Sequence, residues 1–250
     1  MWVVAEPRYA LVTGGSRGIG AAIVKRLAAD GCRVTFTYVN DAAAAGQVET
    51  DVHSAGGVAH GVRVDLTDLK SVEQLTASIP NSQLPHLDVV VNNAAIPTPV
   101  TMIEDTTLDT WNDNLMVAAT APFLIIKHAI AHLRPGASII NISTINASTH
   151  PAAGVAAYVA GKGALEQLTV IAAIELGPRD ITINAVRPGV TDTDMQRAAN
   201  PDPAARSGIA AATPMRRMGQ PTDIADVVAF LAGPQGRWVT GQIITASGGL

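Results

Sequence analysis

The chain has 250 residues, of which 48% are hydrophobic and 15% charged, and its formal net charge at pH 7 is −4. This composition excludes a disordered chain, and the acidic balance disfavours nucleic acid as the main partner, because phosphate binding needs a basic surface. The single cysteine, Cys32, cannot form an internal disulfide, and no apolar run approaches the roughly 18 residues of a membrane span. We therefore expect a cytoplasmic protein without signal peptide or membrane partner.

Strand-like segments alternate with helical segments along the whole chain. Strands are expected at 9–13, 33–38, 58–64, 88–92, 138–142, 182–186 and 242–246. Helices are expected at 18–29, 42–54, 69–78, 108–133, 155–176 and 222–231. Several strands are apolar without alternation, which is typical of a sheet covered on both faces. The pattern predicts the α/β class: a doubly wound, mostly parallel seven-stranded sheet of the Rossmann type with helices on both faces.

A single domain, residues 1–250, is expected because no linker divides the chain. The stretch 189–219 is rich in Pro, Ala and Thr, and no element is predicted in it. A segment of this length inside a compact domain is more typical of a lid than of a linker. We expect it to cover a ligand crevice at the carboxyl ends of the strands.

A glycine-rich turn follows the first expected strand and opens the first expected helix. The spacing in 13–20 is Gly-x3-Gly-x-Gly. Glycines there allow a tight turn and let a pyrophosphate approach the helix N–H groups, although an ordinary strand-to-helix turn is the alternative. The residues expected to bind a dinucleotide through this turn are Gly14, Ser16, Arg17, Gly18, Ile19 and Gly20.

The choice of cofactor depends on the tip of the second strand. This strand ends without a carboxylate to bind a ribose 2′-hydroxyl, and Asn40 or Asp41 is more simply a cap for the next helix. Arg17 is a charged donor suited to a 2′-phosphate, unless it is only a solvated surface residue. The sequence therefore favours NADP(H) over NAD(H).

Two further strand ends carry candidates for binding the nucleoside. Asp65 would accept a hydrogen bond from the adenine amino group or would cap the next helix, for which Asp68 is better placed. After the fourth strand, small residues such as Ala94 would let a nucleoside pass close to the backbone. Asn92 at that position would also brace neighbouring strands.

Tyr158 and Lys162 are four residues apart on an expected helix, so their side chains point the same way. A phenol titrates near pH 10 when unperturbed, and a neighbouring cation lowers its pKa, which suits proton exchange with a substrate oxygen. The alternative is a packed tyrosine covered by a surface lysine.

Ser143 and Thr144, at the end of the fifth strand, would hydrogen-bond a carbonyl oxygen or form a turn. The histidines lack metal-ligand spacing, so no metal is expected.

Four motifs in order, Thr13-Gly14-x3-Gly18-x-Gly20, Asn92-Asn93-Ala94-Ala95, Tyr158-x3-Lys162 and Arg187-Pro188-Gly189, resemble the short-chain dehydrogenase/reductase family. The resemblance is strongest to its single-domain branch, which includes 3-oxoacyl-reductase-like enzymes. It implies hydride transfer between a nicotinamide and a carbonyl carbon. Tyr158 would then be the general acid or base, and Lys162 would bind the nicotinamide ribose and lower the Tyr158 pKa. The resemblance further implies a homotetramer and a cofactor segment consisting of Pro188, Gly189, Val190, Thr191 and Thr193.

Two positions depart from the family pattern. Thr144 fills the place of the catalytic serine, and Ala118 stands where an asparagine that holds a relay water usually sits, with Asn114 one helical turn earlier. The leading hypothesis is an NADP(H)-dependent oxidoreductase acting on a carbonyl or alcohol. The alternative is a nicotinamide-binding sensor or structural subunit with weak or no catalysis. A pocket for an uncharged organic carbonyl is expected to be lined by the lid from Val190 to Arg217 and by Ile96, Ala147, Ser148 and Gly154.

Overall fold

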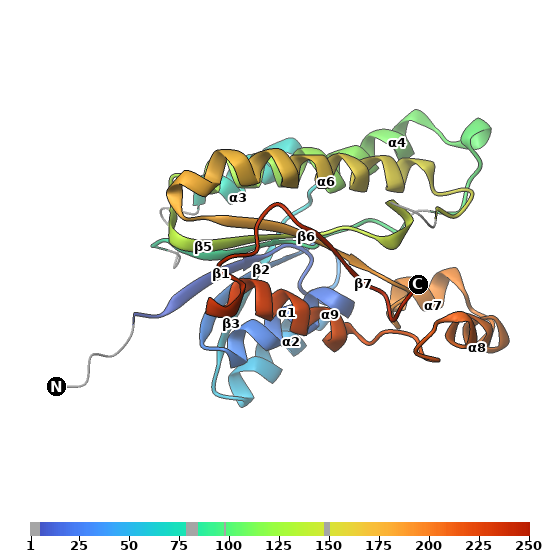
Figure 1. The fold of residues 1–250 in the computed structure, drawn as a ribbon, viewed down its shortest axis with the longest axis horizontal. Helices are drawn as coiled ribbons and strands as arrows, with labels where there is room; N and C mark the ends of the chain where they lie inside the picture. Colours follow the sequence, from blue (N-terminus) through green and yellow to red (C-terminus); the bar gives the residue numbers. More distant parts are fainter. Residues whose placement is uncertain (1–5, 79–84, 98, 148–150) are drawn as a thin grey trace.

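The computed structural model describes residues 6–78, 85–97, 99–147 and 151–250. One sheet, in the order β3-β2-β1-β4-β5-β6-β7, crosses the part of the chain so described, and all its paired strands are parallel (Figure 1). The strand order reverses between β1 and β4, which confirms the predicted doubly wound topology. The strands are β1 (Arg8–Val12), β2 (Cys32–Tyr38), β3 (Val58–Arg63), β4 (Leu87–Asn92), β5 (Leu133–Ile142), β6 (Thr182–Pro188) and β7 (Ile243–Ala246).

Helices cover both faces of the sheet (Figure 1). One face carries α1 (Gly18–Ala29), α2 (Ala42–Ser54) and α9 (Pro221–Ala232). The other carries α3 (Leu69–Ser78), α4 (Leu108–Leu115), α5 (Ala121–Ala129) and α6 (Ala156–Leu176). In β4, Val89 packs into the core beneath α1, α2 and α9, and Val90 packs into the core on the opposite face. Successive strand residues face opposite sides of a sheet. Burial on both faces explains the unbroken apolar run of this strand.

The helix predicted over 108–133 is divided in the structure. A π-helical turn, Met116–Thr120, separates α4 from α5, and β5 already begins at Leu133. Pro122 has no N–H to donate to the carbonyl of Ala118, and its ring would crowd that oxygen in a regular α-helix. A wider turn removes this conflict. Hydrophobic periodicity does not reveal such a turn, so the single long helix was the wrong prediction.

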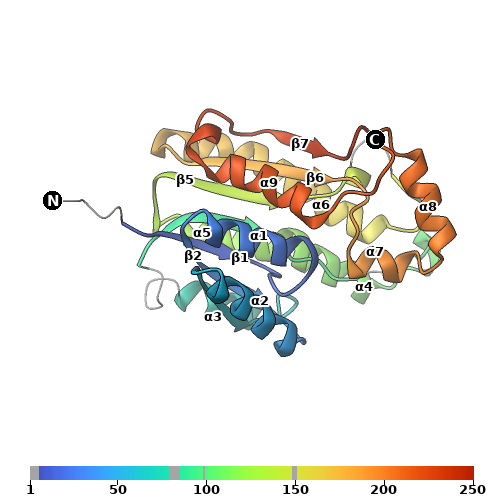
Figure 2. The ribbon, with the colours of Figure 1, turned by 90° about the horizontal axis from the view of Figure 1, so that it is seen from below.

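The segment between β6 and α9 contains two short helices where the sequence pattern predicts none. They are α7 (Asp194–Ala199) and α8 (Pro203–Ala212). Side-chain caps start both, since Thr193 accepts a hydrogen bond from the N–H of Gln196 and Asp202 accepts one from that of Ala204. Figure 2 shows them together beyond the carboxyl ends of the strands, close to the carboxyl terminus of the chain. Across the described ranges, no helix is both long and apolar enough to cross a bilayer.

Candidate active site

The glycine turn after β1 is clamped to the end of β4. The Thr13 hydroxyl accepts hydrogen bonds from the N–H groups of Asn93 and Ala94, each at 3.0 Å. In return, the Asn93 amide donates to the carbonyls of Thr13 at 2.9 Å and Gly14 at 3.0 Å. Gly20 packs so closely that a Cβ there would lie 2.0 Å from the Gly14 oxygen. No role was predicted for Asn93, whose hydrogen bonds fix the shape of the turn.

The start of α1 fits an anionic ligand. No side chain caps this helix at Arg17, and its first turn holds no acidic residue, whereas side chains cap α2, α4, α7 and α8. The first N–H groups of a helix have no partner within the helix, so an uncapped start suits a phosphate. Gly14 and Gly18 adopt positive φ angles of 67° and 54°, which a side chain would disfavour. The residues of this turn therefore fit the pyrophosphate of a dinucleotide.

Polar side chains that follow β3 and end β4 make hydrogen bonds that fix their positions. The Asp65 carboxylate accepts hydrogen bonds from the N–H and hydroxyl of Thr67, whereas Asp68 makes the first hydrogen bonds of α3, as predicted. The buried Asn92 amide donates to the Asn141 side chain at 2.8 Å. The prediction that Asn92 braces neighbouring strands is confirmed. Asn141, which carries this brace on β5, was missed.

Tyr158 is half-buried on the first turn of α6, and its phenol is hydrogen-bonded to the Thr144 hydroxyl. Burial raises the pKa of this phenol, and the hydrogen bond from Thr144 opposes that effect. The expected lowering of the Tyr158 pKa by Lys162 is therefore contradicted in the protein without cofactor. The physical reason is that burial dominates while the Lys162 ammonium points elsewhere.

Lys162 is buried on α6, one helical turn after Tyr158. Its Nζ donates a 2.6 Å hydrogen bond to the carbonyl of Ile142, the last residue of β5. Burial lowers the pKa of this ammonium to about 8, and the Glu166 carboxylate opposes the shift. Lys162 is thus a buried cation with a carbonyl partner, and the alternative of a surface lysine over a packed tyrosine is wrong.

The two adjacent hydroxyls at the end of β5 point to different partners. Thr144 contacts the Tyr158 phenol, whereas the Ser143 hydroxyl donates a 2.6 Å hydrogen bond to Glu166. Arg187 on β6 binds both oxygens of the same carboxylate. Sequence reasoning missed Glu166, although its position four residues after Lys162 places it on the same helical face.

The family asparagine position is occupied by a packing residue. A Cβ built at Gly161 of α6 would lie only 2.8 Å from the Ala118 Cβ, so these small residues let α6 approach the π-helical turn closely. The Asn114 amide donates to the carbonyl of Thr110 on its own helix, at 2.8 Å.

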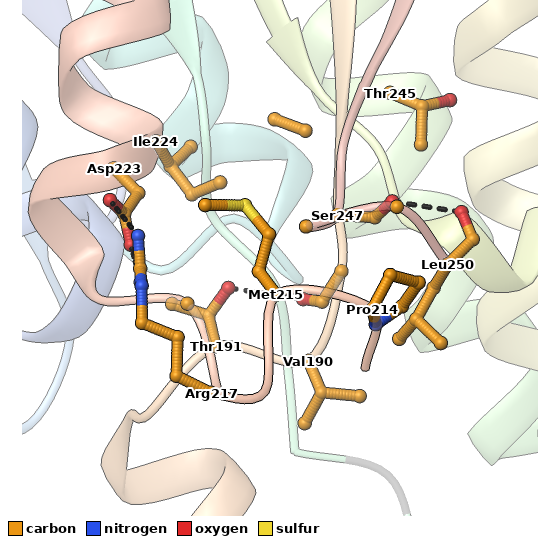
Figure 3. A pocket seen from close by; sticks show the side chains of 15 residues that line it. Val190, Thr191, Pro214, Met215, Arg217, Asp223, Ile224, Thr245, Ser247 and Leu250 are labelled. Carbon is orange, nitrogen blue, oxygen red and sulfur yellow. Dashed lines mark hydrogen bonds and ion pairs between the residues drawn. The ribbon is translucent and has the colours of Figure 1, made fainter. Parts of the chain in front are cut away.

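The segment after β6 lies against the glycine turn. The Thr193 side chain comes within 3.3 Å of the Cβ position of Gly18, and the Thr191 hydroxyl donates to the Gly189 carbonyl. Behind this segment, a cavity of about 820 Å³ opens between α9 and the carboxyl terminus (Figure 3). Its lining is mostly apolar and includes Val190, Pro214, Met215, Ile224 and Leu250. The segment after β6 therefore borders a cavity.

The loop after β4 packs against the segment just before α6. The Thr101 N–H donates to the carbonyl of Gly154, and a Cβ at that glycine would lie 2.5 Å from the Val100 side chain. Ile96 and Ala147 are half-buried, while Ser148 lies outside the described residues. In the described ranges, no three His, Cys, Asp or Glu side chains are grouped to hold a metal ion.

Comparison with known proteins identifies the family. A sequence profile described as Enoyl-(Acyl carrier protein) reductase matches residues 14–250. An uncharacterized oxidoreductase of Methylorubrum extorquens is 39% identical over 247 residues, which are 98% of either chain. A short-chain dehydrogenase/reductase from Serratia marcescens is 38% identical, with a TM-score of 0.90 over 97% of either chain. The chain belongs to the short-chain dehydrogenase/reductase family.

A solved structure of this short-chain dehydrogenase/reductase fold contains the cofactor. The angucycline C-6 ketoreductase LanV with bound NADP is 35% identical and superposes with a TM-score of 0.88, over 97% of this chain and 95% of that one. Family membership indicates a nicotinamide dinucleotide as cofactor, and the uncapped start of α1 and the glycine turn fit its pyrophosphate. The chain is an NAD(P)-dependent oxidoreductase.

Proposed function

We propose that this short-chain dehydrogenase/reductase is an NADP(H)-dependent reductase of uncharged carbonyl compounds, or a dehydrogenase of the matching alcohols. The observation that carries the proposal is the Tyr158 phenol, hydrogen-bonded to Thr144 and followed one helical turn later by the buried cation of Lys162. All three lie where β5 meets α6, at the carboxyl ends of the strands. This is the edge at which doubly wound sheets bind their ligands.

The residues divide the work of the reaction. Bound NADPH supplies the hydride from its nicotinamide. Tyr158 donates a proton to the carbonyl oxygen, and the Thr144 hydroxyl hydrogen-bonds the same oxygen as negative charge develops on it. Lys162 binds the nicotinamide ribose through its buried ammonium group. Ser143 donates a hydrogen bond to Glu166 and so connects the end of β5 to α6, the helix that carries Tyr158 and Lys162.

The segment from Pro188 to Thr193 is assigned to the nicotinamide carboxamide. Its contact with Gly18 supports this assignment, because one ligand would then span the glycine turn and the segment. The adenine end is assigned to Asp65 and to the backbone at Asn92 and Ala94. In these roles, the residues present fit a dinucleotide from one end to the other.

Arg17 is the proposed basis of the preference for NADP(H). It is exposed beside the uncapped start of α1, and no carboxylate stands at the tip of β2. We expect Arg17→Ala to lower kcat/KM for NADPH by about ten- to a hundredfold, the value of a hydrogen bond to a charged group. The rate with NADH should stay unchanged. Arg33→Ala, at the opposite end of β2, is the control, and a wild-type preference for NADH would contradict the assignment.

The substrate proposed is an apolar ketone or aldehyde. Exposed apolar side chains lie on the loop after β4 and on α7, namely Val100, Met102, Ile103 and Met195. Such side chains suit an apolar substrate. A panel of ketones, sugars and acyl thioesters, followed by loss of reduced-nicotinamide absorbance, tests this choice. Tight NADPH binding with no oxidation by any member of the panel would favour the non-catalytic alternative.

A homo-oligomer in the cytoplasm is also proposed. Ile171 and Ile174 on α6 and Phe123 on α5 expose apolar side chains on the outer helical layer, which is typical of an interface between copies. We expect light scattering after gel filtration to give a multiple of 25.8 kDa, the mass of one chain. Ile174→Glu should reduce that mass, because the interface would bury an unpaired charge. A monomeric wild-type protein would contradict the assignment.

A further inference from the structure

A buried carboxylate, Glu166, lies beneath the Tyr158–Lys162 pair on the same face of α6. Its side chain is only 4% exposed. Its oxygens accept three hydrogen bonds of 2.6 Å, one from the Ser143 hydroxyl and two from the Arg187 guanidinium. A carboxylate removed from water is unfavourable unless charged and hydrogen-bonding partners compensate it, and here they do.

These contacts join three elements at the proposed site of chemistry. Ser143 directly precedes Thr144 at the end of β5, and Arg187 directly precedes Pro188 on β6. The two strand ends are also paired, since the Ser143 N–H donates to the carbonyl of Val186 at 2.7 Å. Glu166 therefore connects α6 both to the strand end that bears the catalytic hydroxyl and to the segment assigned to the cofactor.

Glu166 also places a negative charge near Lys162. Burial disfavours the ammonium form of Lys162, and the Glu166 carboxylate acts against that effect. The Arg187 guanidinium binds the far side of the same carboxylate and partly neutralises it. Around Lys162, α6 itself carries Tyr158 and Glu166, and the neighbouring elements β5, β6 and α4 carry or are followed by Ser143, Thr144, Arg187 and the neutral Asn114.

We propose that Glu166 is a positioning residue of the active site, which holds the Thr144 strand end and the 188–193 segment in place around Lys162. Glu166 acts through Lys162, Ser143 and Arg187. This inference rests on the proposed function, because it concerns the same Tyr158–Lys162 pair. It predicts that the acid–base behaviour of the enzyme depends on a residue one helical turn below that pair.

The test is the pH profile of kcat/KM for NADPH between pH 6 and 10, at saturating carbonyl substrate. In the wild type we expect a decrease above pH 8, as Lys162 loses its proton. Glu166→Gln should move this decrease to lower pH by about one pH unit, because the charge that favours the ammonium form is gone. Glu166→Asp keeps the charge and should restore a profile close to the wild type.

Two further variants separate charge from structural damage. Arg187→Gln removes the cation that neutralises Glu166, so the decrease should move to higher pH, opposite to the effect of Glu166→Gln. Glu175→Gln makes the same chemical change at an exposed position of α6 and should leave the profile in place. Damage to the fold alone would not move the two partner variants in opposite directions.

Each outcome has a distinct meaning. If Glu166→Gln lowers the melting temperature while the midpoint of the profile stays at the wild-type pH, Glu166 is only structural and the inference is overturned. If the wild type shows no NADPH-dependent turnover, the proposed function fails instead. The same variants are then compared by the pH dependence of the NADPH dissociation constant, measured by nicotinamide fluorescence. An unchanged midpoint in Glu166→Gln again overturns the inference.

Discussion

Replacing Tyr158 with Phe is expected to lower kcat for carbonyl reduction by about 10³-fold, the contribution of a positioned general acid. The phenol is hydrogen-bonded to the Thr144 hydroxyl, and its raised pKa keeps it protonated and able to donate to a carbonyl oxygen at neutral pH. NADPH affinity should change little, because the lost interaction is made only as the carbonyl oxygen gains charge. Steady-state rates and nicotinamide fluorescence measure the two effects separately.

Tyr9→Phe is the matched control for that variant. It removes the same hydroxyl at the other end of the sheet, where the Tyr9 ring packs edge-on against His86 with ring centres 4.9 Å apart. We expect wild-type turnover from it. A Tyr158→Phe enzyme that keeps more than about a tenth of the wild-type kcat would require another proton donor. The mechanism proposed here would then be wrong.

The raised pKa of Tyr158 bears on the direction of the reaction. In the protein without cofactor, the phenol holds its proton throughout the neutral range, which is the form needed to donate to a carbonyl oxygen. Alcohol oxidation needs the phenolate instead. Because a phenol with a raised pKa loses its proton only at high pH, oxidation should be favoured at higher pH than reduction.

The order of elements was predictable from the sequence because each unit of the fold is local. A strand such as β4 is marked by its unbroken run of Val, and the start of α2 by the cap at Asp41. The π-helical turn was not predictable, because its cause is a steric conflict between Pro122 and Ala118 that periodicity does not measure. The helices α7 and α8 were not predicted because they are short and bury no side chain fully, so their sequences show no apolar stripe of helical period.

The candidate site was predictable where one residue type at one spacing carries the chemistry. Tyr158 and Lys162 are of this kind, since helical geometry alone puts them on one face. The partners of Ser143 were not predictable, because Glu166 and Arg187 come from elements far apart in the chain. The Tyr158 pKa was misjudged for the same reason. A sequence shows that a cation is near, but neither the burial of the phenol nor the direction of the ammonium.

Gly20→Ala is the second substitution with a large expected effect. A methyl group at this position would lie 2.0 Å from the Gly14 carbonyl oxygen and 2.6 Å from the Asn93 amide nitrogen. Neither atom belongs to a flexible chain end, since the Asn93 amide is held by the carbonyls of Thr13 and Gly14. We expect the free energy of unfolding to fall by about 2 kcal/mol, the usual effect of overpacking.

The same substitution should weaken NADPH binding by at least about tenfold, because the glycine turn must move apart from β4 to admit the methyl group. Gly46→Ala in α2 is the control. No atom lies within 4 Å of the added Cβ, and the change should stabilise the helix by about 0.5–1 kcal/mol with unchanged NADPH affinity. Thermal unfolding and nicotinamide fluorescence of the two variants decide the matter. Equal melting temperatures and equal affinities would mean that the clamp through Asn93 does not define the cofactor site.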